Sequence, residues 1–263
     1  MIALDYCKLS LAYDPLSRYD YKVQKGSICM TIKANENKAL TVCVNGQEYE
    51  RLPIKTKLVM PNDKIDAVVG EFATPFLQDG DILFVTEKIV AITQGRAYPI
   101  KDVKPRKLAY TLSNYVTKTP HGIGLGMPET MEMALRECGT PRIIFAAGVA
   151  AITKVFGRKG DFYRVAGYKA RSIDGPTSHT IPPYNEYVVL GPERPNEVAK
   201  ELKALFDKDI DVIVVDINDL GGNILGSSNS AIDLDQMVKI LKDNPLGQQS
   251  QSTPLGIIRK VKA

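Results

Sequence analysis

The stretch VIVVDINDLGGN, residues 212–223, sets four β-branched aliphatic residues directly before an acid, an amide, a second acid and two glycines. A short continuous apolar run of this kind is typical of a strand that is buried on both faces. Ligands of open α/β sheets bind beyond the carboxyl ends of the strands, and Asp216 would stand at such an edge. The same residues also fit a turn or a helix cap, because Asp and Asn are preferred there. The stretch therefore predicts a buried strand and leaves a ligand site and a plain turn both open.

The segments around this stretch alternate between helical and strand patterns. The spacing of Val198 and Leu202 predicts a helix that leads into the strand, and a helix capped by Asp233, the polar loop 247–253 and a last strand follow it. Upstream, Asp79-Gly80-Asp81 turns the chain into an apolar strand, after which residues 89–92 form a strand or a short helix. Helices are expected over residues 105–116 and 128–138, and RIIFAAG, residues 142–148, is expected to be a buried strand.

The N-terminal part of the chain has a different pattern. Residues 28–52 alternate as three strands, and Asn45-Gly46 is a strong hairpin signal between the last two. We interpret residues 1–54 as an N-terminal β-meander extension and residues 55–263 as the main domain. The expected fold class is α/β (α+β), with two intertwined lobes and mixed β-sheets.

Composition excludes several classes of protein. A chain of 263 residues is long enough to bury a stable core, and its four cysteines contain no CxxC pair, so neither a disulfide framework nor a zinc knuckle is indicated. Two histidines leave little material for a His-based metal site or catalytic triad. The net charge of +4 is modest and spread along the chain, so we expect anionic small molecules rather than nucleic acid as partners. Without a run of eighteen apolar residues, we expect a cytoplasmic protein with no membrane partner.

A second acid with polar neighbours lies in RSIDGPTSHTIPPY, residues 171–184, where Asp174 precedes a glycine, a proline and the hydroxyl of Thr177. Two aspartates from separate loops are typical of a magnesium ion that also binds phosphates. An ordinary Asp-Gly turn is the alternative. No GxxxxGK[ST] loop is present, whereas GQQSQST, residues 247–253, is either a phosphate-binding loop or a plain surface loop.

Five segments in order carry a resemblance to a known family. The sequence resembles the coenzyme F420-0:L-glutamate ligase (gamma-glutamyl ligase) family over about residues 55–263, through GDILFVTEKIVAITQGR (80–96), GMPETMEMALRE (126–137), SIDGPTSHTIPP (172–183), VIVVDINDLGG (212–222) and PLGQQSQSTPLGIIRK (245–260). The resemblance implies a ligase that joins an amino acid, L-glutamate above all, to a small-molecule carboxylate through an acyl phosphate. It also implies GTP (or ATP) as co-substrate, Mg²⁺ or Mn²⁺, and a homodimer.

Site residues follow from the same resemblance. It implies metal ligands at Asp174, Asp216 and Gln248. It implies nucleotide contacts at Lys57, Leu58, Val59, Glu87, Lys88, Thr177, Gly247, Gln248, Gln249, Ser250, Gln251 and Ser252. In such a reaction the substrate carboxylate is the nucleophile, so the protein needs no Ser, Cys or His nucleophile. Asp219 and Glu87 are our candidates for the base that takes a proton from the incoming ammonium.

Three departures from the family pattern remove charges. Ile92 replaces a lysine, INDLGG replaces the usual residues after the strand, and Gln248 replaces an acid. These departures favour a non-catalytic nucleotide-binding regulatory protein on the same scaffold as the first alternative. An unrelated metal-dependent phosphate-ester enzyme is the second alternative.

Overall fold

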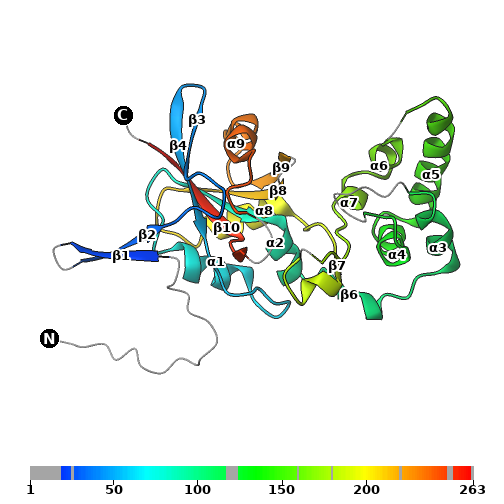
Figure 1. Cartoon of the computed structure of the whole chain (residues 1–263), viewed down its shortest axis with the longest axis horizontal. Helices are drawn as coiled ribbons and strands as arrows, with labels where there is room; N and C mark the ends of the chain where they lie inside the picture. Colours follow the sequence, from blue (N-terminus) through cyan, green and yellow to red (C-terminus); the bar gives the residue numbers. More distant parts are fainter. Residues whose placement is uncertain are drawn as a thin grey trace.

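The computed structural model describes residues 19–24, 27–116, 124–158, 160–178, 180–218, 221–247 and 251–261. It is an α+β structure around a mixed six-stranded sheet (Figure 1), which confirms the expected fold class. The strands are β1 (Tyr19–Gln24), β2 (Ser27–Ile32), β3 (Thr41–Val44), β4 (Gln47–Ile54), β5 (Ile82–Thr86), β6 (Ala97–Pro99), β7 (Tyr187–Val189), β8 (Asp211–Asn218), β9 (Gly221–Ser227) and β10 (Leu255–Lys260). The helices are α1 (Ile65–Ala73), α2 (Glu87–Thr93), α3 (Lys107–Ser113), α4 (Pro128–Glu137), α5 (Thr140–Val155), α6 (Asp161–Ala166), α7 (Tyr168–Arg171), α8 (Pro195–Lys203) and α9 (Leu234–Leu241), with 3₁₀ turns at Ile100–Asp102 and Tyr184–Glu186.

The central sheet has the order β3-β4-β10-β5-β8-β9. Strands β5 and β8 are parallel, with Thr86 opposite Val215, and all other neighbours are antiparallel. Because β10 runs against both β4 and β5, its first residue, Leu255, lies opposite Ile54 and Val85, near the carboxyl ends of those strands. Four segments therefore meet where strands of the sheet end, and we call this place the sheet edge. Strands β4, β5 and β8 end there, and strand β10 begins there.

Both faces of the sheet are covered. Leu83 and Val212 pack with α1, α2 and α8 on one face, whereas Phe84 and Ile213 pack with α9 on the other. This explains why the strand at 212–215 is apolar at every position instead of alternating. In β10, Gly256 lies against the ring of Phe84, and a Cβ there would come within 2.3 Å of that ring.

A buried ion pair joins the start of β5 to the end of β10. Asp81 is only 1% exposed, and its two carboxylate oxygens accept hydrogen bonds of 2.8 and 2.7 Å from the Arg259 guanidinium. Arg259 also donates to the carbonyl of Phe76, and the amide of Gln78 donates to Asp81. Burial of Asp81 is therefore compensated by charge and by hydrogen bonds.

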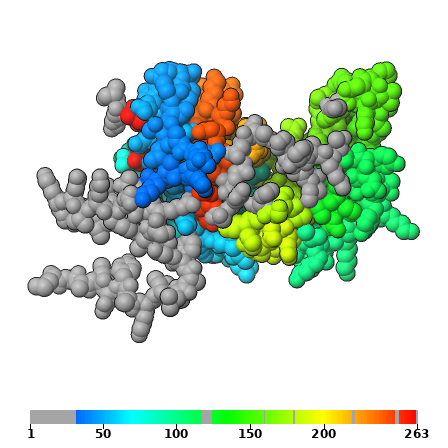
Figure 2. Space-filling view, in the orientation of Figure 1, coloured from blue at the N-terminus to red at the C-terminus, as the bar shows by residue number. Residues whose placement is uncertain are grey.

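The second lobe is helical in the part of the chain that the structure describes. The chain leaves the sheet lobe after β6, forms α3 to α7, and returns through β7, which pairs with β6. Figure 1 shows these helices beside the sheet lobe, and Figure 2 shows their green residues as a separate mass. The lobe has its own core, built around Leu125, Met131 and Ile143. The mixed sheet belongs to one lobe, and the chain passes twice through the β6–β7 connection.

The prediction of a strand over residues 142–148 is wrong, because the segment lies inside helix α5. Gly139, with φ of 86°, ends α4, and Pro141 lies in the first turn of α5, a position that proline favours. The alanines that follow are strong helix formers. A short apolar run does not separate a strand from a helix, and here the flanking residues decide.

The predicted meander is confirmed in part. Strands β3 and β4 form a hairpin, and Asn45 and Gly46 have positive φ angles of 53° and 78° at its turn, as the sequence predicts. Strand β2, however, pairs with β1 in a separate sheet, and β4 joins the central sheet through β10. The division of the chain after residue 54 stays a prediction.

Helix α5 carries large apolar side chains that point to solvent. Ile144, Phe145, Ile152, Val155 and the following Phe156 are 49–83% exposed, and we call these five residues the α5 apolar face. Among the described residues, no single helix is long and apolar enough to cross a membrane, whereas α4 and α5 together, bent by 118°, meet that test of length and composition.

Candidate active site

Glu87 and Lys88 begin α2 directly after strand β5 ends. The amide of Thr86 donates a hydrogen bond of 3.0 Å to the carbonyl of Pro254, which fixes this strand end against the loop before β10. The parallel register of Thr86 with Val215 places the next residues, Glu87 and Asp216, at the same level of the sheet edge. Sequence positions 129 residues apart are thereby brought together by strand pairing.

Asp216 lies within strand β8, which continues to Asn218, and it is opposite Asn223 of β9. The alternative that Asp216 begins a turn or caps a helix is therefore wrong. Burial raises the pKa of Asp216, the negative charge of Asp174 raises it further, and Lys88 lowers it. Burial and a neighbouring acid both disfavour the ionised form of such a carboxylate, and an added positive charge would stabilise it.

Asp174 reaches the same edge from the helical lobe. Its amide donates to the Val189 carbonyl at 2.8 Å and its carbonyl accepts from the Val189 amide at 3.0 Å, so strand β7 holds its backbone. Its carboxylate forms an ion pair of 2.8 Å with Lys88 Nζ. The side chain of Asp174 therefore faces the beginning of α2 across the boundary between the lobes.

Two of the three acids, Glu87 and Asp216, have raised pKa values. Burial raises the pKa of Glu87 well above its ordinary range, and the charges of Asp216 and Asp174 raise it further. The charge of Asp174 raises the pKa of Lys88 despite its burial. Three carboxylates thus surround one ammonium group, which leaves a local excess of negative charge. Such perturbed groups are typical of functional sites.

Tyr168, the first residue of α7, joins the two lobes at this point. Its hydroxyl donates a hydrogen bond of 3.2 Å to Glu87 Oε2. Burial, followed by the charge of Glu87, raises the pKa of the phenol, so Tyr168 stays protonated and able to donate. No spacing in the sequence indicated this residue, because it lies in a segment that reads as loops and is 81 positions from Glu87.

Tyr168→Phe should raise the pKa of Glu87 further. The substitution removes a hydrogen bond that stabilises the ionised carboxylate, so more Glu87 is protonated at a given pH. The measurement is a ¹³C NMR titration of labelled glutamate side chains, with Glu87→Gln to assign the resonance. Tyr110→Phe, on the exposed surface of α3, is the matched control. An unchanged Glu87 titration in Tyr168→Phe would contradict this role.

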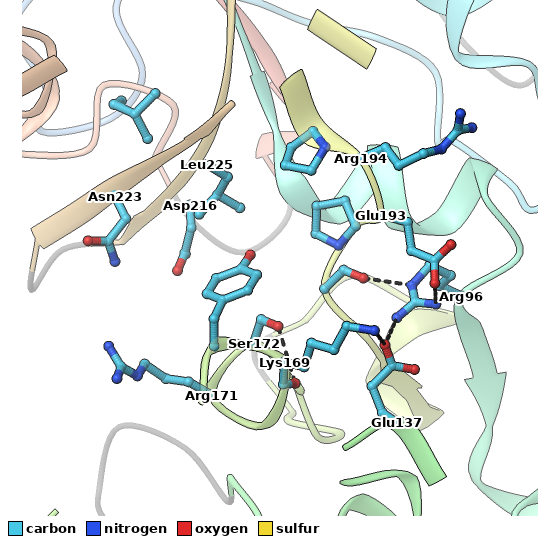
Figure 3. Close-up of a pocket in the computed structure, with 15 residues that line it drawn as sticks. Arg96, Glu137, Lys169, Arg171, Ser172, Glu193, Arg194, Asp216, Asn223 and Leu225 are labelled. Carbon is cyan, nitrogen blue, oxygen red and sulfur yellow. Dashed lines mark hydrogen bonds and ion pairs between the residues drawn. The ribbon is translucent and has the colours of Figure 1, made fainter. Parts of the chain in front are cut away.

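A cavity of about 640 Å³ opens beside Asp216 (Figure 3). Asp216 and Asn223 lie on one side of it and Arg96 and Glu137 on another, and Tyr168 also belongs to the lining. The Arg96 guanidinium lies 2.7 Å from Glu137 Oε1. The volume is in the usual range for small-molecule sites, about 300–1,000 Å³.

The sequence model of one family, described as F420-0:Gamma-glutamyl ligase, matches residues 53–258. The chain belongs to this family. Among curated proteins no match to the chain is found. Membership implies gamma-glutamyl ligase activity and supports an enzyme. Strands β4 and β10, which pair with each other, lie at the two ends of the matched region.

The nucleotide-contact residues inferred from the F420-0:gamma-glutamyl ligase resemblance gather in part at the same edge. The amide of Thr56 donates to the carbonyl of Ser252 at 3.0 Å, which joins the turn at residues 57–59 to the loop before β10. Lys57 is half exposed and pairs with Asp63 at 2.6 Å. Val59 is buried, and its carbonyl accepts a hydrogen bond of 2.5 Å from the Tyr184 hydroxyl.

The other residues of this set have different environments. Leu58 packs against the core, so its side chain serves packing. Thr177 Oγ1 lies 2.9 Å from Thr180 Oγ1 in the turn after Asp174. Gly247 and Ser252 have positive φ angles of 69° and 52°, and a Cβ on Gly247 would come within 3.2 Å of Gln251 Cγ. Gln248, Gln249, Ser250 and Asp219 lie outside the described residues.

The donors present at the edge fit a hard divalent cation. Within the described part of the chain, no three His, Cys, Asp or Glu side chains form a group that could hold a metal ion. A magnesium ion, however, commonly takes only one or two carboxylates and completes its shell with water and phosphate oxygens. Asp174 and Asp216 supply two such carboxylates from the two lobes.

One departure from the F420-0:gamma-glutamyl ligase pattern has a structural explanation. Ile92 is 2% exposed and packs in the core behind α2 with Val90 and Ile89. The side chain at this position therefore points away from the sheet edge. The family pattern places a positive charge at this position. On helix α2, the only basic residue is Lys88.

Proposed function

We propose that this chain is a nucleotide- and divalent-metal-dependent ligase that joins an amino acid, with L-glutamate expected, to a carboxylic acid. The observation that carries the proposal is the meeting of Glu87, Lys88, Asp174 and Asp216 at one sheet edge, beside a cavity of about 640 Å³. Family membership supports the ligase chemistry. GTP or ATP would be the phosphoryl donor.

The proposed reaction has two steps. An oxygen of the substrate carboxylate attacks the γ-phosphorus, which forms an acyl phosphate and releases the nucleoside diphosphate. The amine of the second substrate then attacks the acyl carbon, and inorganic phosphate leaves while the ammonium proton passes to a base. A bound Mg²⁺ or Mn²⁺ supplies charge neutralisation for the phosphates.

The residues of the chain have separate roles in this scheme. Asp174 and Asp216 would hold the cation, and Lys88, which pairs with Asp174, would donate a hydrogen bond to a phosphate oxygen. Glu87 is our candidate base, because its raised pKa brings proton exchange closer to neutral pH. Tyr168 holds the Glu87 carboxylate in place.

Calorimetric titration of GTP and ATP, each with and without Mg²⁺ or Mn²⁺, tests the nucleotide and metal requirement. The proposal expects binding of at least one nucleotide that strengthens with metal. Release of nucleoside diphosphate should then need both a carboxylic acid and an amino acid. Failure of both nucleotides to bind in the presence of metal would sink the proposal.

A non-catalytic nucleotide-binding regulator is the second candidate. The loss of an acid at Gln248 favours it, since this loss removes a group that would contact phosphate or metal, whereas Ile92 lies in the core. Such a regulator would bind nucleotide but release no diphosphate with any pair of acid and amine. The turnover measurement above separates the two candidates.

We also propose that the protein is a homodimer, with the α5 apolar face in the interface. Five exposed apolar side chains on one short stretch of helix form a patch that is typical of protein contacts. Phe145→Glu combined with Ile152→Glu should convert the dimer to a monomer, as measured by size-exclusion chromatography with light scattering. Lys154→Glu, exposed on the same helix, should leave the dimer intact. A native protein that is monomeric at all concentrations would refute the homodimer.

A further inference from the structure

The cavity beside Asp216 adjoins the candidate active site, but no substrate has been assigned to it so far. It lies between α7, residues 191–195 and strand β9, and Asp216 forms part of its lining (Figure 3). Residues 55–59 and 251–254 meet at the sheet edge and include residues that we expect to contact the nucleotide. None of them lines this cavity. Asp216 therefore stands between two regions, with the sheet edge on one side and the cavity on the other.

The charges that line the cavity are mostly paired with each other. Arg96 forms ion pairs of 2.7 Å with Glu137 and 3.0 Å with Glu193, and Lys169 forms a third of 3.0 Å with Glu137. This network makes one wall of the cavity, as the dashed lines in Figure 3 show. Both glutamates of the lining are neutralised there, and Asp216 is the acid of the lining that this network leaves out.

Two cations of the lining remain outside this network. The side chains of Arg171 and Arg194 have no hydrogen bond or ion pair to any described residue. In Figure 3, Arg171 extends from α7 on the same side as Asp216 and Asn223, whereas Arg194 lies on the opposite side. Arg171 is therefore the unpaired cation on the side of the reacting edge.

The helix that carries Arg171 is held firmly against the site. Arg171 ends the four-residue helix that Tyr168 begins, and Tyr168 is bonded to Glu87. Three residues further on, Asp174 is tied to strand β7 by two backbone hydrogen bonds. Gly191 permits the close packing of this helix, because a Cβ at Gly191 would come within 2.2 Å of Ser172 Oγ. The backbone on both sides of Arg171 is thus fixed.

We propose that this cavity binds the carboxylic acid substrate, and that Arg171 selects acids that carry a second negatively charged group. The inference rests on the proposed ligase function. The reacting carboxylate lies toward Asp216 and the sheet edge, and the second anionic group lies against Arg171. A guanidinium group binds a carboxylate or a phosphate through two parallel hydrogen bonds, which makes it more selective than a simple positive charge.

Binding of simple acids tests the selection without any nucleotide. Glutarate and pentanoate have the same number of carbons and differ in the second carboxylate, and 4-phosphonobutyrate replaces that carboxylate by a phosphonate. Calorimetry on the full-length protein should show at least tenfold tighter binding of one or both dianions than of pentanoate. The stronger of the two dianions identifies the second group as a carboxylate or a phosphate.

Arg171→Gln should lower the affinity for the preferred dianion to that for pentanoate and leave pentanoate binding unchanged. Arg171→Lys should recover only part of the preference, since it keeps the charge and loses the two parallel bonds. Lys200→Gln, an equal loss of charge on the exposed face of α8, should behave as the native protein. Equal binding of all three acids to the native protein, or an unchanged preference in Arg171→Gln, would overturn the inference.

Titration of GTP with magnesium on the same samples keeps the two proposals apart. Loss of the dianion preference in Arg171→Gln with unchanged GTP binding supports both. A dianion preference that depends on Arg171 in a protein that binds no nucleotide would refute the ligase function while the cavity still selects dianions. GTP binding without any dianion preference would refute the role of Arg171 alone.

Discussion

Asp216→Asn should remove most of the metal-dependent part of nucleotide binding, with an affinity loss of at least tenfold. Asparagine keeps the size of the side chain and one oxygen but loses the negative charge that a divalent cation needs. A tenfold loss corresponds to about 1.4 kcal/mol. Asp174→Asn should have a similar effect, because the charge of Asp174 acts on Asp216 at the same edge. Calorimetric titration with and without magnesium measures both.

A second readout separates this effect from a general disturbance of the fold. The charge of Asp216 is one of the causes that raise the pKa of Glu87, so Asp216→Asn should lower that pKa even without nucleotide. Asp207→Asn, at an exposed position after α8, is the matched control and should change neither measurement. Metal-dependent binding of native strength in Asp216→Asn would show that this acid is not a ligand.

Arg259→Met should destabilise the protein by about 3 kcal/mol, a typical cost for removing one partner of a buried ion pair. The substitution leaves the Asp81 carboxylate, 1% exposed, without its charged partner. Three hydrogen bonds donated by the guanidinium are lost with it. Chemical denaturation, followed by circular dichroism, gives the change in the free energy of unfolding.

The double variant Asp81→Asn with Arg259→Met tests the cause. With a neutral amide at position 81, no buried charge is left alone, so the double variant should lose less stability than the sum of the single variants. Lys260→Met, on the same strand and exposed, should be close to native. Additive losses in the double variant would indicate that packing, and not charge, is the cause.

The edge where the candidate residues meet could be predicted from the sequence. The apolar run before Asp216 and the Asp79-Gly80-Asp81 turn before β5 both indicated buried strands, and resemblance to the family pointed to Glu87, Lys88, Asp174 and Asp216. Asp233 caps α9 as expected, since its carboxylate accepts a hydrogen bond from the Gln236 amide at 3.0 Å. These features depend on short stretches of sequence, where local preferences and packing agree.

The residues that the helical lobe contributes to the candidate site could not be predicted from the sequence. Tyr168 and Arg171 lie in a segment rich in Gly, Lys and Arg that has no clear periodicity, and their importance comes from distant contacts. The strand prediction for residues 142–148 is wrong because a short apolar run fits a strand and a buried helix equally well, whereas Pro141 marks the start of helix α5. Pairings across 81 positions, such as Tyr168 with Glu87, arise from the tertiary fold and leave no spacing pattern in the sequence.

The boundary between the lobes carries like charges on its two sides. Asp174 arrives with the helical lobe, whereas Asp216 and Glu87 belong to the sheet lobe, and the charge of Asp174 raises the pKa of both Glu87 and Asp216. Electrostatic repulsion therefore acts to separate the lobes when the acids are ionised, and Lys88 and Tyr168 oppose it at this point. A doubly charged cation between the acids reverses the direction of that force. A cation in such a site would therefore hold the two lobes together at the reacting edge, and its loss would leave them held there against the repulsion of their own acids.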